Sequence, residues 1–426
     1  MKVIIVGGGG REHALAWKLH RDDPSLELIA APGNPGIAEL GRCEAIAATD
    51  IDALSALARR EKADLTVIGP EGPLEAGIAD RFREQGLAVF GPTSGAARIE
   101  TSKTWAKALM LRAGVPTAAA ETFSDPAGAR AEVRRLGAPV VIKATGLAAG
   151  KGVVVAQTLR DADDAIAMML EKRAFGDAGG EVLVEQFMTG EELSIFALTD
   201  GTHAQVMLAA QDHKRIGEGD TGPNTGGMGA YTPVSIASDA VMDDAMDRVF
   251  MPTLAAMRAE GVPFTGLLYA GLMLTPDGPK VVEFNCRFGD PETEAILPMM
   301  ESSLLDRMLT IAHSGSLKDL SPLRWRSGAS VTTVIAAAGY PGSVKNGDRI
   351  SLPPITDGVT VFHAGTKRDA DGALVTAGGR VLAVTATGPT LRAAQHASAG
   401  YAAAVTFTGR QFRRDIGWRD LARAGA

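Results

Sequence analysis

The chain has 426 residues, of which 46% are hydrophobic, 22% charged and 5% aromatic, and its net charge is −7. A chain of this length is too long for one compact core and predicts roughly two to four domains. Its composition is that of ordinary globular proteins. The acidic balance and the few aromatic side chains argue against a nucleic-acid partner, because no basic surplus can displace counterions. Two cysteines, Cys43 and Cys286, exclude a disulfide framework and favour a reducing, cytoplasmic location. No apolar run approaches the length of a membrane span.

The first hundred residues alternate short apolar strands with helices. The predicted strands are 3–6, 26–30, 64–68 and 87–90, and the predicted helices are 12–19, 52–60 and 74–85. Repeated βα units predict a parallel sheet with helices on both faces and ligands at the carboxyl ends of the strands. Those ends carry four glycines at 7–10, then Pro32, Gly33 and Asn34, and finally Gly69, Pro70 and Glu71.

The remaining elements suggest a small inserted unit, a larger sheet and a C-terminal α+β part. Helices are expected at 96–113, 126–136, 162–170, 239–260, 294–312 and 391–404. Strands are expected at 140–144, 153–156, 182–185, 267–274, 281–284, 329–336, 359–362 and 380–385. The turn Pro276-Asp277-Gly278 predicts that the strand 267–274 and the next one form a hairpin.

The strand around residue 283 carries the most informative polar row. Because side chains alternate along a strand, Glu283, Asn285 and Arg287 are expected on one face. Oxygen ligands from Glu and Asn suit Mg²⁺, and a neighbouring guanidinium suits a transferring phosphoryl group. The alternative is an edge strand with a solvated polar face. Cys286 falls on the other, core-facing side of the strand.

The glycine turn at 7–10 does not fit a dinucleotide fingerprint. The third glycine position of G-x-G-x-x-G is Glu12 or His13, and no acidic residue ends the second strand. What remains is a nest of backbone amides at a helix N-terminus, which favours a phosphate, with Arg11 and His13 as further donors. A tight turn with no ligand is the alternative.

A second glycine-rich loop follows Lys143 and contains Gly146, Gly150, Lys151 and Gly152. It is not a P-loop, because three residues separate the glycines, glycine follows the lysine, and the loop joins two strands. We interpret it as a lid that closes over phosphates, with Lys143 reaching in from the strand. A lysine inside an apolar run is expected to be paired or liganded, which the alternative of a surface hairpin would not explain.

Two further clusters are weaker signals. The segment 185–192 lies between two predicted units, where the base of a nucleotide could bind. The alternative is that its acidic residues are simply solvated, as acidic residues beside a turn usually are. Asp212, His213, Lys214 and Arg215 precede a long polar loop, 217–229, and long loops are often functional. A solvated charge cluster is the equal alternative.

Five motifs in order closely resemble those of the phosphoribosylamine–glycine ligase family of the ATP-grasp superfamily. They are GGGREH from Gly8, GKG from Gly150, QDHKR from Gln211, GPNTGGMG from Gly222 and NCRFGDPE from Asn285. The resemblance implies that ATP, glycine and 5-phosphoribosylamine give glycinamide ribonucleotide, ADP and phosphate in purine synthesis, through glycyl phosphate and with Mg²⁺ or Mn²⁺. It also implies an α/β and α+β multidomain fold. The expected parts are a Rossmann-like parallel-sheet (pre-ATP-grasp) domain at 1–101, an ATP-grasp region at 102–325 with a lid at about 123–187, and a small α+β domain at 326–426.

The resemblance also implies roles for individual residues. The ATP contacts are implied at Lys103, Lys143, Gly146, Gly150, Lys151, Gly152, Glu185, Phe187 and Glu192, and the metal ligands at Glu283 and Asn285. The phosphoribosylamine site is implied at Gly8, Gly9, Gly10, Arg11, Glu12, Gly33 and Asn34. Groups around the reacting carboxylate and amine are implied at Lys143, Asp212, Lys214, Arg215, Arg287 and Asp290. The strand before Glu283 lacks the acid that many ATP-grasp enzymes carry there, so the number of metal ions stays open.

The residue types suit this chemistry, since a carboxylate needs activation before an amine can attack it. No Ser-His or Cys-His pairing suggests a covalent enzyme nucleophile. A lid that excludes water is expected, because acyl phosphates hydrolyse. The rival interpretations are another ATP-grasp ligase or carboxylase, a nicotinamide enzyme and a catalytically dead ATP-binding regulator. We expect a monomer with small-molecule substrates, no nucleic acid and no membrane.

Overall fold

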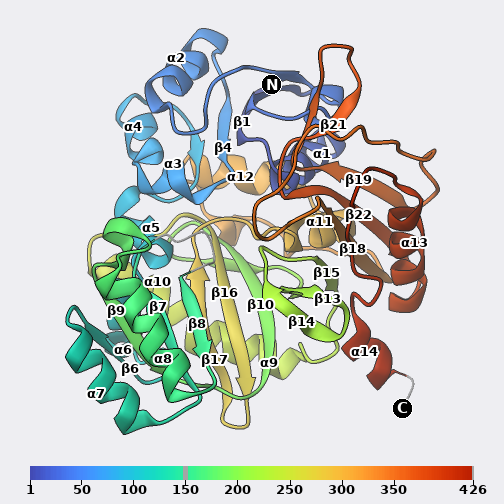
Figure 1. The fold of residues 1–426 in the computed structure, drawn as a ribbon. Helices are drawn as coiled ribbons and strands as arrows, with labels where there is room; N and C mark the ends of the chain where they lie inside the picture. The colour runs from blue at the N-terminus through green and yellow to red at the C-terminus, as the bar shows by residue number, and fades with distance from the viewer. Residues whose placement is uncertain (147–151, 425–426) are drawn as a thin grey trace.

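The computed structural model describes residues 1–146 and 152–424 (Figure 1). Its N-terminal region is a five-stranded parallel sheet in the order β3-β2-β1-β4-β5, which confirms the predicted parallel sheet. The strands are β1 (Lys2–Gly7), β2 (Glu27–Pro32), β3 (Arg42–Cys43), β4 (Leu65–Ile68) and β5 (Val89–Phe90). The helices are α1 (Gly10–Asp22), α2 (Ile51–Glu61), α3 (Glu71–Glu75), α4 (Ile78–Glu84) and α5 (Ser94–Thr101).

The next region is a small unit with its own antiparallel sheet, β6-β9-β7-β8, seen in teal and green in Figure 1. The strands are β6 (Ala120–Phe123), β7 (Val140–Ala144), β8 (Val153–Ala156) and β9 (Val182–Gln186). The helices are α6 (Lys103–Ala113), α7 (Pro126–Leu136) and α8 (Leu159–Ile166), the last continued by a π-helical turn, Ala167–Glu171. β7 and β8 are antiparallel neighbours, so the second glycine-rich loop does join two strands, as predicted.

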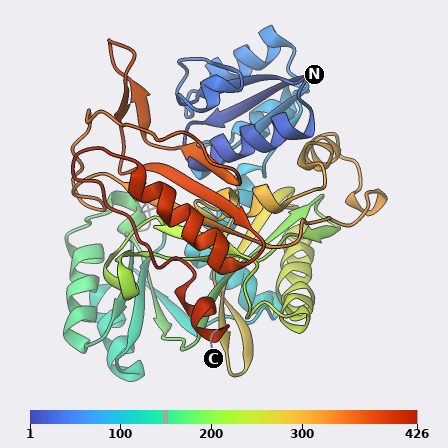
Figure 2. The ribbon, with the colours of Figure 1, turned by 90° about the vertical axis from the view of Figure 1, so that its right-hand side faces the viewer.

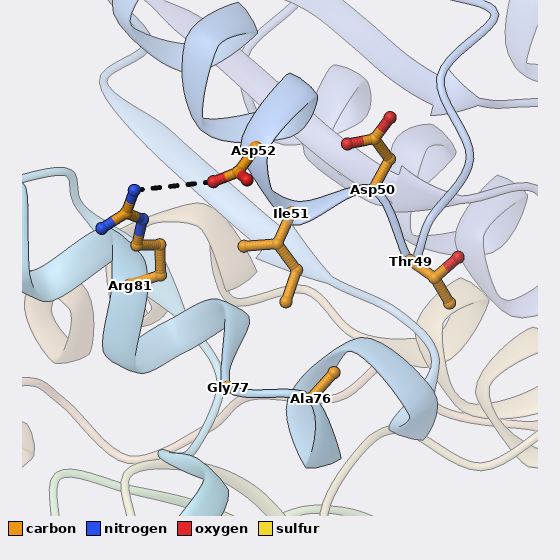
Figure 3. Close-up of a pocket in the computed structure, with 7 residues that line it drawn as sticks. All are labelled: Thr49, Asp50, Ile51, Asp52, Ala76, Gly77 and Arg81. Atoms are coloured by element: carbon orange, nitrogen blue, oxygen red, sulfur yellow. Dashed lines mark ion pairs between the residues drawn. The ribbon is translucent and has the colours of Figure 1, made fainter.

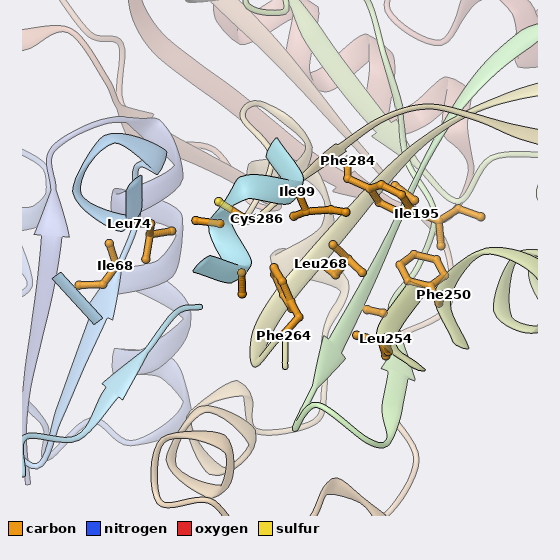
Figure 4. Close-up of a cluster of buried hydrophobic side chains, with 14 of the residues drawn as sticks. Ile68, Leu74, Ile99, Ile195, Phe250, Leu254, Phe264, Leu268, Phe284 and Cys286 are labelled. Carbon is orange, nitrogen blue, oxygen red and sulfur yellow. The ribbon is translucent and has the colours of Figure 1, made fainter. Parts of the chain in front are cut away.

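The central region is a four-stranded sheet in the order β11-β10-β16-β17. The strands are β10 (Glu191–Thr199), β11 (Ala204–Val206), β16 (Gly266–Thr275) and β17 (Gly278–Asn285). The predicted hairpin is confirmed, because β16 and β17 pair antiparallel. A continuous helix follows the expected range as α9 (Asp239–Ala245), a π-helical turn (Met246–Phe250) and α10 (Met251–Ala259). Ile68 and Leu74 of the N-terminal region share one core with Leu268 and Phe284 of this sheet and with Phe264, which lies just before β16 (Figure 4).

The C-terminal region completes a sheet that begins in the middle of the chain, in the order β12-β15-β18-β22-β19. The strands are β12 (Gln211–Asp212), β15 (Gly229–Thr232), β18 (Ala329–Ala336), β19 (Val359–His363) and β22 (Arg380–Gly388). Two small sheets pair β13 (Arg215–Gly217) with β14 (Thr221–Asn224), and β20 (Thr366–Arg368) with β21 (Leu374–Thr376). The helices of this part are α11 (Glu292–Ile296), α12 (Leu304–Ala312), α13 (Leu391–Ala404) and α14 (Trp418–Arg423). Figure 2 shows α13 lying across the C-terminal sheet. The predicted domain boundary at 325/326 therefore crosses a continuous sheet, and the exact boundaries stay predictions.

Three predicted helices are interrupted in the structure. The helix expected at 74–85 breaks at Gly77, whose φ of +86° is left-handed. The helix expected at 96–113 breaks at Ser102, which is extended and accepts a hydrogen bond from the Trp105 amide to start α6. The helix expected at 294–312 breaks after Met299, where a 3-10 turn that continues α11 ends, and Ser303 caps α12. No helix in the described residues is long and apolar enough to span a membrane.

Candidate active site

The predicted metal ligands lie at the end of β17. Glu283 pairs with Gly271 of β16 and Asn285 with Tyr269, and a register shift separates Glu283 from Val281. The strand ends at Asn285, because the next amide, of Cys286, donates to the Glu100 carboxylate at 2.7 Å. The prediction that Arg287 continues the strand is therefore wrong: it lies in the following turn. The packing role of Cys286 is confirmed, since it is 1% exposed.

Arg287 is held by two carboxylates from the N-terminal region. Its Nε lies 3.1 Å from Glu71 Oε2 and its Nη2 lies 2.9 Å from Glu100 Oε1. Burial raises the pKa of Glu100, although Arg287 opposes this. At Glu71 burial also opposes ionisation, but Arg287 and Arg11 outweigh it and lower the pKa. The guanidinium is thus fixed in position before any substrate binds.

Buried lysines line the side of the small sheet. Lys143 is 4% exposed and its Nζ lies 2.7 Å from Glu185 Oε2, which confirms that it is buried and paired. The same Nζ donates to the Val282 carbonyl at 2.9 Å, which ties β7 to β17. Lys107 Nζ lies 3.0 Å from Glu185 Oε1. Burial disfavours the ionised form of Glu185, but Lys143 and Lys107 outweigh it and lower its pKa.

Lys103 lies near the same cluster and donates through Nζ to the Gly146 carbonyl at 3.2 Å. Burial lowers the pKa of Lys103, while Glu283 raises it and Lys143 lowers it further. These mutual effects place Lys103 near both the predicted metal ligand and the predicted phosphate ligand. The Gly152 carbonyl accepts from the Ala144 amide at 2.8 Å, whereas Gly150 and Lys151 lie outside the described residues.

A second ionisable cluster lies beside the central sheet. Lys214 forms an ion pair with Glu192. Burial raises the pKa of Asp212 to about 7, with Lys214 opposing and Glu292 adding to the rise. Burial works against the charge of Lys214, but Asp212 and Glu192 outweigh it and raise the pKa of Lys214. The structure thus brings Asp212 and Lys214, which the resemblance implies near the reacting atoms, together with Glu192, which it implies at the ribose.

Glu292 belongs to this cluster and was not predicted. It is 3% exposed, and its Oε1 accepts from the Tyr269 hydroxyl at 2.7 Å. The Tyr269 hydroxyl also lies 2.8 Å from Ser194 Oγ. The chain of hydrogen bonds fixes one carboxylate close to Asp212.

The N-terminal glycine turn is shaped by Glu12. Its Oε2 accepts from the Gly9 amide at 2.6 Å, and its Oε1 lies 2.6 Å from Arg11 Nε. A Cβ at Gly8 would lie 2.4 Å from the Gly33 carbonyl oxygen, and one at Gly69 would lie 2.1 Å from Glu12 Oε1, so a side chain at either position would displace the Gly33 backbone or the Glu12 side chain.

Residues of the C-terminal region close the glycine turn. Asn34 Nδ2 donates to the Gly8 carbonyl at 3.0 Å and to the His363 carbonyl at 2.8 Å. His13 Nδ1 accepts from the His363 amide at 2.8 Å. Burial lowers the pKa of His13 to about 3, so it is a neutral packing group and not a cationic donor.

One carbonyl joins the glycine turn to the end of β17. Arg11 Nη1 and Arg287 Nη1 each donate to the Phe288 carbonyl at 3.2 Å. Nearby, Asp290 Oδ1 lies 3.1 Å from Arg380 Nη1. Arg11, predicted to bind phosphoribosylamine, and Arg287, predicted to lie near the phosphoryl group, therefore meet at one backbone carbonyl.

The last two predicted residues are Arg215 and Phe187. The Arg215 guanidinium donates to the Gly222 carbonyl at 2.6 Å within its own hairpin. Phe187 is half-buried just after β9. Neither position tests the role that the resemblance implies.

Sequence reasoning missed several residues of the site. They are Glu100, Lys107, Ser194, Tyr269, Glu292 and Arg380. Lys107 and Glu100 could have been found as charges on otherwise apolar helix faces. Arg380 and Ser194 come from distant strands and carry no local signal.

A shallow groove of about 440 Å³ lies in the N-terminal region between α2 and α4 (Figure 3). Asp52 and Arg81 form an ion pair across it, with Oδ1 and Nη2 3.5 Å apart. Its lining includes none of the predicted site residues, so it is not part of the candidate active site.

Family models of phosphoribosylglycinamide synthetase match the chain in three consecutive parts. The N domain matches residues 1–100, the ATP-grasp (A) domain 101–293 and the C domain 330–419. The chain belongs to the phosphoribosylglycinamide synthetase family. Among curated relatives, it is 50% identical to the phosphoribosylamine–glycine ligase of Chlorobaculum tepidum, covering 99% of this chain and 100% of that protein. It is 49% identical to that of Salmonella typhimurium, covering 99% of each.

Solved structures agree with this membership of the phosphoribosylglycinamide synthetase family. The phosphoribosylamine–glycine ligase of Thermotoga maritima superposes with a TM-score of 0.86 at 33% identity, covering 98% of this chain and 100% of that one. The biotin carboxylase domain of the Hydrogenobacter thermophilus 2-oxoglutarate carboxylase, crystallised with MgADP, has a TM-score of 0.73 at 16% identity and shows the fold alone. The predicted family, three-part fold and class of ATP-dependent ligase are confirmed.

Proposed function

We propose that this chain joins glycine to 5-phosphoribosylamine through glycyl phosphate at the site where Arg11 and Arg287 meet. The supporting observation is that both guanidinium groups donate to the Phe288 carbonyl at 3.2 Å. A phosphate on the amides of the glycine turn would lie beside Arg11, within reach of an acyl group near Arg287. The membership of the ligase family supplies the two substrates and ATP.

Glu283 and Asn285 fit a hard divalent cation. Each offers an oxygen ligand, and Mg²⁺ is usually held by one or two carboxylates plus nucleotide phosphates and water. No group of three or more His, Cys, Asp or Glu side chains that could hold a metal occurs in residues 1–146 and 152–424. A site with few protein ligands therefore needs the nucleotide to complete it. Bound there, Mg²⁺ or Mn²⁺ would neutralise charge on the transferring phosphoryl group.

The remaining residues position substrates and offset charge. Lys103 and Lys143 would bind the ATP phosphates, with Gly146, Gly150, Lys151 and Gly152 in the lid and Glu185, Phe187 and Glu192 around the nucleoside. Lys214 and Arg287 would orient the carboxylate of glycine, and Asp212, Asp290 and Arg215 would surround the reacting amine. Gly8, Gly9, Gly10, Arg11, Glu12, Gly33 and Asn34 would hold phosphoribosylamine.

We further propose that the enzyme acts as a cytoplasmic monomer on small molecules alone, with domains at 1–101, 102–325 and 326–426. Product analysis with glycine and freshly made phosphoribosylamine tests the function. Glycinamide ribonucleotide, ADP and phosphate are expected in equal amounts. Release of ADP with bicarbonate, or with other amino acids at rates equal to that with glycine, would overturn the proposal.

A further inference from the structure

Arg413 connects the end of the chain to the β13–β14 hairpin. It is 0% exposed and is the largest fully buried side chain in the described residues. Its Nε and Nη2 each lie 2.8 Å from an Asp415 carboxylate oxygen, and its Nη1 lies 2.8 Å from Asp220 Oδ1. Nη1 also donates to the Arg215 carbonyl at 3.1 Å. A buried arginine that binds one carboxylate with two nitrogens and a second carboxylate with the third has a fixed geometry, so it holds the two segments rigidly together.

Other residues of the C-terminal segment 413–419 also contact the same hairpin. The Gly219 amide donates to Asp415 Oδ2 at 2.8 Å, and the Arg414 amide donates to Glu218 Oε1 at 3.0 Å. Arg419 Nη2 lies 2.5 Å from Asp220 Oδ2. The hairpin is therefore held at several points by one short segment.

The hairpin turn adopts a backbone conformation that needs support. Gly219 has φ of +65° and Asp220 has φ of +56°, both left-handed. Residues other than glycine adopt this region at a free-energy cost, although Asp and Asn tolerate it best. The contacts of Asp220 with Arg413 and Arg419 offset that cost, so the turn depends on the C-terminal segment.

The same segment reaches the residues just after β12, which ends at Asp212, two positions before Lys214. Between them, His213 is 1% exposed, and its Nε2 accepts from the Gly417 amide at 3.2 Å. Because side chains alternate along an extended chain, His213 faces the C-terminal segment while Asp212 and Lys214 face the site. The C-terminal segment 413–419 therefore contacts residues 212–220 on the side that faces away from the site.

We propose that Arg413 is a positioning residue for the reaction, acting through Asp220 and His213 to hold Asp212 and Lys214 against bound glycine. This inference rests on the proposed function for its substrate. The hydrogen bonds and ion pairs of Lys103 and Lys143 go to Gly146, Glu185 and Val282 instead, so the ATP phosphates should not depend on Arg413.

Steady-state kinetics of Arg413→Met and Asp220→Asn test the proposal. Asn keeps the left-handed tolerance of Asp220 but removes its charge. For both variants kcat/KM for glycine should fall at least about tenfold, while the Kd for MgADP, measured by calorimetry, changes less than about threefold. Arg349→Ala, which removes an exposed arginine of the same region, should match the wild type. Unchanged glycine kinetics, or a larger change for MgADP than for glycine, would overturn the proposal.

Hydrogen exchange provides a readout that does not need the reaction. In both variants the amides of residues 213–224 should exchange at least about tenfold faster, while those of β16 and β17 keep their protection. Faster exchange throughout the protein would show a general structural role and contradict the proposal. If the wild-type protein made no glycinamide ribonucleotide, the proposed function would fail. Hydrogen exchange of residues 213–224 would still show whether Arg413 is coupled to this segment.

Discussion

Lys107 and Lys143 bind opposite oxygens of one carboxylate, that of Glu185, at 3.0 and 2.7 Å. Lys107 belongs to α6 and Lys143 to β7, so Glu185 links a helix to the small sheet beside the proposed nucleotide site. All three side chains are at most 7% exposed. Two ammonium groups therefore depend on one buried negative charge.

We expect Glu185→Gln to lower the free energy of unfolding by about 3–5 kcal/mol, because it leaves two buried ammonium groups without a counter-charge. Adding Lys107→Met to Glu185→Gln should recover part of this loss, since it removes the repulsion between the Lys107 and Lys143 ammonium groups. Urea unfolding measures both, with Glu181→Gln, an exposed position just before β9, as control. A double variant no more stable than Glu185→Gln would contradict the charge argument.

The metal assignment predicts a large kinetic effect at Glu283. Glu283→Ala should cut kcat by several hundredfold or more, if metal support is worth about 4 kcal/mol. ADP release measured across a Mg²⁺ titration checks this. Asp277→Ala, in the exposed turn of the same hairpin, is the matched control. Near-wild-type activity of Glu283→Ala would remove the assignment.

The glycine turn predicts a substrate-selective effect. Arg11→Ala should raise the KM for phosphoribosylamine far more than that for ATP, because Arg11 lies at the N-terminus of α1 and away from the lysine cluster. Initial rates with each substrate varied in turn measure this. Arg21→Ala, at the exposed end of the same helix, should leave both values unchanged. Equal increases would mean that the glycine turn serves the nucleotide.

Buried histidines predict acid sensitivity. Burial lowers the pKa of His13 and His213 to about 3 and that of His363 to about 4. The unfolded chain takes up these protons near pH 6.5, so the stabilisation is complete above that pH and is lost as pH falls toward 4. At pH 5 each of these histidines should lower the free energy of unfolding by about 2 kcal/mol relative to its value above pH 6.5.

The variant His363→Gln isolates one of these groups. The loss of unfolding free energy between pH 7 and pH 5 should shrink by about 2 kcal/mol in this variant, because one proton fewer is taken up on unfolding. His396→Gln, at an exposed histidine, should lose as much as the wild type. Urea unfolding at both pH values gives the comparison, and identical losses in all three proteins would rule out the explanation.

Most of the fold could be predicted from periodicity. The strands β7, β8 and β18 and the helices α7 and α13 have the predicted bounds, because apolar pattern and flanking Gly or Pro agree there. The interruptions in three helices were not predicted, since Ser102 and Gly77 are compatible with a helix locally and tertiary contacts decide the break. The two-residue strands β3 and β12 carry no periodicity at all.

The candidate site was predictable where a residue type was unexpected in its local setting. Lys143 inside an apolar strand is such a case, and the row on β17 is another. Glu292 and Tyr269 could not be paired from sequence, because 22 residues lie between them and only the folded hairpin brings the hydroxyl to within 2.7 Å of the carboxylate. Arg287 was assigned to the strand because alternation alone cannot reveal that Glu100 captures the Cys286 amide.

The sheet that β12 and β15 share with β18, β22 and β19 has a consequence for dissecting the protein. A fragment cut before β18 would bare the hydrogen-bonding edge that β15 covers, and such an open edge pairs readily with other chains. The two fragments are therefore expected to stay soluble only when they are produced together, so that β15 and β18 can pair.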